Sequence, residues 1–167
     1  MVRVRGVGVA AVAAGIVVAG AITSLSVARA EAPPPAMGTG CAPDLAEAMT
    51  LLPDGTTYAA CRQVGWGYSW TAVQTPFAPN DTWWSYGPPI TLHGQGMRNP
   101  NLSSGQWTAT PRTPEATCAA TQTTVVEAGV LAQPQVTEGE QGQPLTVEML
   151  PSLFYVDLAG DCLWVKE

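Results

Sequence analysis

The sequence has few charged side chains and few of the residues on which most enzymes depend. Charged residues make up 12% of the chain, and His93 is the one histidine; soluble domains usually carry about twice that charged fraction. No Gly-x-Ser-x-Gly motif surrounds a serine, and no Asp-x-Asp-x-Asp-Gly spacing suggests a calcium loop. The usual sequence evidence for a hydrolase or a calcium site is therefore missing.

Positive charge is especially scarce after residue 30. Four cations stand against thirteen carboxylates there, a formal charge of −9, and they are scattered as Arg62, Arg98, Arg112 and Lys166. Binding a nucleic acid requires a cluster of Lys or Arg that displaces counterions from the phosphates. A nucleic-acid partner is therefore not expected.

The four cysteines lack the spacing of a zinc or redox site, because no pair is separated by two residues. In a protein exported to an oxidising compartment, an even number of cysteines favours disulfides, here two. Of three possible pairings we favour the sequential one, in which each bond closes a local unit: Cys41 with Cys61, and Cys118 with Cys162. Neither a metal nor a cofactor is expected.

The N-terminus has the features of an export signal. Arg3 and Arg5 precede an uncharged stretch, Gly6 to Ala28, and Ala28-Arg29-Ala30 has the small-x-small form that signal peptidase cleaves. We predict a Sec signal peptide at residues 1–30, cleavage after Ala30 and a secreted or extracytoplasmic protein. The alternative is an uncleaved anchor, which the Ala- and Gly-rich composition disfavours; contact with a membrane is expected only in that case.

The remaining chain is predicted to contain a Pro- and Gly-rich linker, residues 31–40, and one disulfide-bonded domain, residues 41–167. Apolar residues from Asp44 to Leu52 are spaced as on one face of a helix, which Pro53 would end. Short apolar and Thr-rich segments then alternate with glycine turns. The predicted fold is mainly β, a small antiparallel sandwich or barrel with one short N-terminal helix, stapled by two disulfides.

The first aromatic group follows a strand pattern. Trp66, Tyr68 and Trp70 alternate with small residues, as core-facing side chains of a strand do. Core packing is favoured for these three over an exposed binding face.

The second aromatic group, Trp83, Trp84 and Tyr86, lies in a stretch broken by prolines, which predicts a loop or an edge strand. An exposed row of these rings could stack on the sugars of a cell-wall glycan or hold an apolar ligand. Burial in the core is the alternative, and the sequence favours neither.

Two sets of residues are weak catalytic candidates. His93 would need a nucleophile, and Ser103 and Ser104 lack the elbow and the acid of a triad, so a plain strand-end histidine is favoured. Asp157 and Asp161 could form the carboxylate pair of a glycosidase, but both flank a glycine turn, where Asp is common. The structural interpretation is favoured for both sets.

The second half of the chain resembles a small β-module of secreted and lipoprotein-like envelope proteins in actinobacteria, of the mycobacterial type. The resemblance begins near Gly94 and rests on Gly105-Gln106-Trp107, Cys118, the segment Leu145 to Met149 and Cys162-Leu163-Trp164. It implies a Cys118–Cys162 bond and a bacterial envelope setting, and it implies no activity.

The sequence therefore predicts a secreted or cell-envelope protein of a high-GC bacterium with a non-enzymatic, binding or structural role. A glycan- or apolar-ligand-binding module that uses Trp83, Trp84 and Tyr86 is the alternative, and a hydrolase is less favoured. The sequence identifies no partner; a cell-wall glycan and an envelope protein are the candidates.

Overall fold

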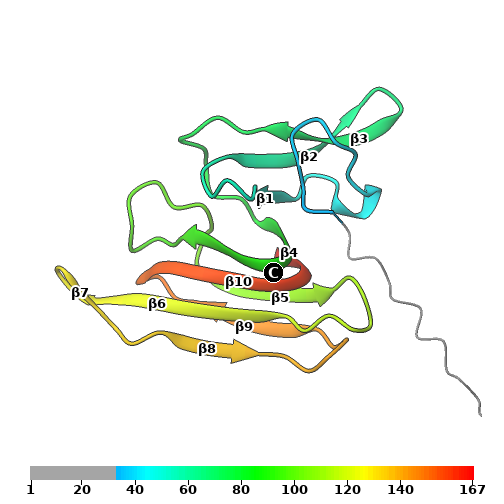
Figure 1. The fold of residues 1–167 in the computed structure, drawn as a ribbon. Coiled ribbons are helices and arrows are strands. Elements are labelled where there is room, and N and C mark those ends of the chain that lie inside the picture. Colours follow the sequence, from blue (N-terminus) through cyan, green and yellow to red (C-terminus); the bar gives the residue numbers. More distant parts are fainter. Residues whose placement is uncertain (1–32) are drawn as a thin grey trace, which may run out of the picture. The chain divides into compact units, whose positions relative to one another are not determined.

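The computed structural model describes residues 33–167, so the predicted signal peptide lies outside the described residues. Within this range, a 3-10 helix, η1 (Pro43–Leu45), precedes ten strands, and no helix is long and apolar enough to cross a membrane. The strands (Figure 1) are β1 (Met49–Leu51), β2 (Tyr58–Val64), β3 (Gly67–Ala72), β4 (Thr82–His93), β5 (Gly105–Pro111), β6 (Ala119–Glu127), β7 (Val130–Leu131), β8 (Gln135–Glu138), β9 (Leu145–Met149) and β10 (Leu153–Lys166).

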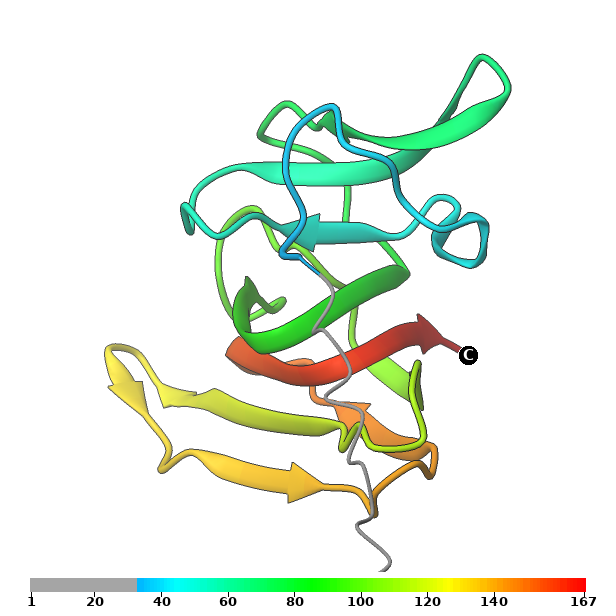
Figure 2. The ribbon, with the colours of Figure 1, turned by 45° about the vertical axis from the view of Figure 1, so that its right-hand side comes forward.

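Strand β10 is the centre of the sheet. One edge of β10 pairs with β4, while the other edge pairs with β6 in its first half and with β5 in its second half. Beyond β4 the sheet continues through β1, β2 and β3 (Figure 2). On the other side of β10 the sheet divides into two branches: β9 pairs with β5, and β8 pairs with β6. The predicted antiparallel sandwich or barrel is therefore corrected to a branched, mixed sheet, which does not close into a barrel and in which β1 and β4 run parallel.

The sheet buries two hydrophobic clusters. Trp83, Trp107 and Trp164 belong to the larger one, and Trp70 and Trp84 belong to the smaller one. Successive side chains of a strand point to opposite faces, so a strand that contributes to both clusters is covered on both sides. Strand β4 contributes Trp83 to the larger cluster and the adjacent Trp84 to the smaller one.

The prolines of β4 occupy a bulge within a central strand, which corrects the prediction of a loop or an edge strand. Leu158 pairs with Ile90 and Gly160 pairs with Gly87, so β4 has one residue more than β10 between these pairs. Pro88 and Pro89 fall inside this irregularity, where a missing N–H does not interrupt the ladder.

The predicted N-terminal helix is wrong beyond its first turn. Residues 43–45 form η1, but Glu47 has a φ of 64°, and Met49 to Leu51 are the strand β1. The left-handed conformation at Glu47 ends any helix. The apolar residues around it are then shared between the two clusters, with Leu45 in the smaller and Met49 in the larger.

The segment predicted as a linker, residues 31–40, pairs with the domain through its C-terminal part. Gly38 N–H donates to the Trp70 carbonyl, Trp70 N–H donates to the Thr39 carbonyl, and Gly40 forms a bridge with Ser69. These bonds cover the outer edge of β3, and an edge strand covered by backbone is protected from pairing with other chains.

Both predicted disulfides are confirmed. Cys41–Cys61 joins the segment before η1 to β2, and Cys118–Cys162 joins the start of β6 to β10. Two disulfides indicate an oxidising environment outside the cytoplasm.

The turn between β1 and β2 supplies a titration prediction. The carboxylate of Asp54 accepts the Thr57 hydroxyl and the backbone N–H groups of Thr56 and Thr57, and these bonds lower its pKa from 3.8 to about 2. Because the folded pKa is depressed, the contribution to stability is complete above about pH 4 and is lost as the pH falls towards 2. We expect the carboxyl carbon of Asp54 to titrate near pH 2 by NMR, and at a higher pH in Thr57→Val, which loses the hydroxyl that lowers this pKa most. A midpoint near 3.8 in the parent protein would contradict this.

Candidate ligand-binding site

The two tryptophans of β4 lie in the core, so burial holds for them and the alternative of an exposed binding face does not. Trp83 is 0% exposed and its indole N–H donates to the Asn80 carbonyl, while Trp84 is 6% exposed and stacks on Trp70 at 5.3 Å. Tyr86 is partly exposed, and its hydroxyl donates to the Leu51 carbonyl. The central position of β4 explains this burial, because both of its faces are covered.

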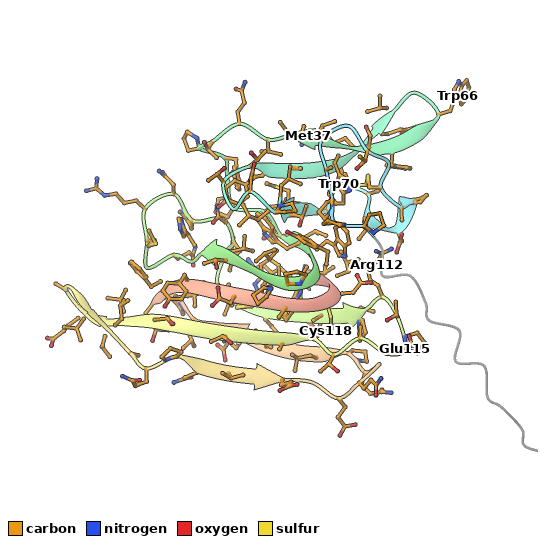
Figure 3. All side chains as sticks on the ribbon, in the orientation of Figure 1. Met37, Trp66, Trp70, Arg112, Glu115 and Cys118 are labelled. Carbon is orange, nitrogen blue, oxygen red and sulfur yellow. A yellow bond between two sulfur atoms is a disulfide. The ribbon has the colours of Figure 1, made fainter. Side chains whose placement is uncertain are left out.

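The exposed tryptophan is Trp66, which the strand pattern assigned to the core. Gly65 and Trp66 are the two central residues of the turn that joins Val64 to Gly67, and Gly65 has a φ of 61°. Glycine at the first of two central positions suits a tight hairpin turn. The Trp66 side chain is fully exposed and points away from the domain at the hairpin tip (Figure 3).

A cavity of about 330 Å³ opens beside the end of β4. We call it the His93 pocket. Four segments line it: the start of β2, the loop before β4, the end of β4 and the loop after β4. The residues are Tyr58, Thr75, Pro76, Phe77, His93, Met97, Arg98, Asn99 and Asn101.

Asn101 connects the walls of the His93 pocket. Its side-chain oxygen accepts both the backbone N–H of His93, at 2.7 Å, and the hydroxyl of Tyr58, at 3.2 Å. Its backbone N–H donates to the His93 carbonyl, and its carbonyl accepts the N–H of Asn80. Asn101 is 5% exposed, and a buried amide with this many partners fixes the geometry of its neighbours.

The loop after β4 is fixed against β10. Gly94 N–H donates to the Phe154 carbonyl and Gly96 N–H donates to the Leu153 carbonyl. A Cβ atom on Gly94 would overlap the backbone and side chain of Leu153, so this approach requires glycine. The loop that carries Met97 and Asn99 is therefore held in place by β10.

Aromatic rings also line the pocket. Tyr58 packs edge-on against Phe77 with a centroid distance of 5.0 Å, and against Trp83 at 6.0 Å. Burial raises the pKa of Tyr58 above 10.0, although the hydrogen bond with Asn101 acts in the opposite direction. The phenol is thus neutral at physiological pH, and its hydroxyl donates a hydrogen bond to the side-chain oxygen of Asn101.

No known protein family, curated protein or solved structure matches this chain. The function of the site is therefore inferred from its own residues.

The structure places His93 and Asp157 on one face of the sheet without a contact between them, and it separates Asp157 from Asp161. His93 lies opposite Tyr155, and Thr91 lies opposite Asp157, so all four side chains share one face of β4 and β10. The Thr91 hydroxyl donates to Asp157 at 2.6 Å. Residues 157 and 161 are about 13 Å apart along the strand at 3.3 Å per residue, beyond the roughly 5–9.5 Å of a glycosidase pair.

Asp161 has structural partners of its own. It accepts the indole N–H of Trp84 at 2.9 Å and lies 3.8 Å from the guanidinium of Arg112, which also contacts Asp44 at 3.0 Å. Ser103 and Ser104 do not line the His93 pocket. Neither Asp nor Glu nor serine is therefore among the residues that line this pocket with His93.

Of the residues that line this pocket, the sequence had singled out His93 alone, as a weak catalytic candidate and not as a binding residue. Tyr58, Phe77 and the loop that carries Arg98 and Asn101 are distant from one another in the chain and share no motif. The useful signal was the Gly- and Pro-rich loop directly after His93, since binding residues concentrate on loops held by a rigid scaffold.

Proposed function

We propose that this protein is an extracytoplasmic, non-enzymatic binding domain that holds a small ligand in the His93 pocket. The observation that carries the proposal is the organisation of the pocket by Asn101, which joins Tyr58 to His93 through one buried oxygen. A pocket of this kind has apolar rings for contact and a few fixed polar groups for orientation. Its setting, as we propose it, is the envelope of a high-GC bacterium, which the resemblance of the second half supports.

Small molecules containing one aromatic ring test this proposal. We expect 2-phenylethanol to shift the amide signals of Tyr58, Phe77, His93 and Asn101 in a saturable manner by NMR. Phe77→Ala removes one aromatic wall, and we expect it to weaken this binding about fivefold, equivalent to about 1 kcal/mol of ring contact.

Val136→Ala is the matched control, because Val136 is 67% exposed on β8 and does not line the pocket. It should leave binding unchanged. If the parent protein gives a folded spectrum and no molecule with one aromatic ring, charged or neutral, causes saturable shifts around the pocket, the proposed function is refuted.

A second candidate function is glycan contact through Trp66. A fully exposed indole at a hairpin tip can stack on a sugar ring, as aromatic faces do. Binding of cell-wall glycan that Trp66→Ser abolishes and Phe77→Ala preserves would favour this candidate over the His93 pocket.

A further inference from the structure

The arginine of the His93 pocket differs from the two arginines elsewhere in the described residues. Arg62 pairs with Glu47 at 3.4 Å, and Arg112 pairs with Asp44 at 3.0 Å. Arg98 is exposed, lines the pocket, and forms no ion pair or hydrogen bond with the described part of the chain. Its guanidinium therefore retains all five donors for another molecule.

The charge around Arg98 is unusual for this acidic protein. Carboxylates outnumber cations by thirteen to four after residue 30, yet no Asp or Glu is among the residues that line the pocket. An acidic lining would neutralise Arg98 internally. Its absence leaves a local positive site on a negative domain.

The neutral part of the lining limits the shape of the ligand. Tyr58, Phe77, Pro76 and Met97 supply rings and apolar surface, and His93 and Asn99 add polar groups near Arg98 in sequence and space. The volume of about 330 Å³ lies at the lower end of the range for small-molecule pockets. A compact molecule with one apolar ring fits this size.

From these observations we infer that the His93 pocket binds a small carboxylate with an aromatic or cyclic apolar body. This inference rests on the proposed function. The ring contacts Tyr58 and Phe77, and the carboxylate binds Arg98, whose planar guanidinium can donate two parallel hydrogen bonds to it.

Three probes of one shape separate the charge from the ring: phenylacetate, 2-phenylethanol and 2-phenylethylamine. We expect phenylacetate to bind most tightly and the amine to bind least. Arg98→Gln should weaken phenylacetate about fivefold, the upper range for an exposed ion pair, and should leave 2-phenylethanol unchanged. Arg98→Lys should retain part of the preference, because it keeps the charge and loses the bidentate geometry.

Arg62→Gln is the matched control, since it removes an exposed arginine outside the pocket, and it should preserve the order of the three probes. Equal binding of all three probes at the pocket would overturn this inference and leave the proposed function standing. Inorganic phosphate competing as well as phenylacetate would also overturn it, because the ring would then contribute nothing. Failure of every probe to reach the pocket would reject the proposed function as well.

Discussion

Replacing Trp164 with alanine is expected to lower the free energy of unfolding by about 3–5 kcal/mol. Trp164 is 0% exposed in the larger cluster, and its indole N–H donates to the Ser85 hydroxyl at 2.9 Å. The substitution removes a large buried ring from the central strand and leaves Ser85 without this donor. Urea unfolding followed by circular dichroism measures the change.

The next residue along β10 is a suitable control for this experiment. Val165 is 40% exposed, so Val165→Ala should change the free energy of unfolding by about 0.5 kcal/mol or less. Similar losses in Trp164→Ala and Val165→Ala would show that the side chain of Trp164 is not in the core.

Loss of the Cys118–Cys162 disulfide is expected to have the second large effect. The two cysteines are 44 residues apart and both are 0% exposed, whereas Cys41 and Cys61 are 20 residues apart and Cys41 is partly exposed. Loop-closure entropy predicts a loss of about 4 kcal/mol for the first pair and about 3 kcal/mol for the second, when each is replaced by two alanines.

The two double variants serve as controls for each other, because each removes two sulfur atoms and one bond. Urea unfolding at the same protein concentration gives both values. A larger loss of unfolding free energy in Cys41→Ala/Cys61→Ala than in Cys118→Ala/Cys162→Ala would show that loop length and burial do not determine which disulfide stabilises the domain more.

The strand content and the disulfide pairing were predictable from the sequence. Glycine turns between Thr-rich segments indicated a mainly β fold, because turn chemistry acts over a few neighbouring residues. The number and order of the cysteines indicated Cys41–Cys61 and Cys118–Cys162, although these bonds close loops of 20 and 44 residues.

Features that depend on distant strands were not predictable. Trp83 and Trp84 pair with Trp164 and Leu163 of β10, so their burial was determined by residues about eighty positions away. Local propensity also failed at Met49, where pairing with both β2 and β4 selected a strand instead of the helix that the apolar spacing suggested. Tertiary contacts commonly override such weak local preferences.

The residues of the His93 pocket were not predictable from the sequence for the same reason. Tyr58, Phe77 and Asn101 meet only because β2, the loop before β4 and the loop after β4 are brought together by the sheet. Asn101 stands in an N-x-S sequon, which says nothing of a ligand pocket, and Tyr58 and Phe77 stand in no motif. A pocket assembled from such separate segments has no signature in one sequence.

The position of β10 sets the order in which the domain can complete its structure. The ribosome makes residues 153–166 after every other described strand, and this strand joins β4 to both β5 and β6. A nascent chain that ends before Leu153 contains β4, β5 and β6 but lacks β10, the strand with which all three pair. Contacts between strands so distant in sequence form slowly. The native fold must therefore form after synthesis of the last strand, and until then the chain remains incompletely folded.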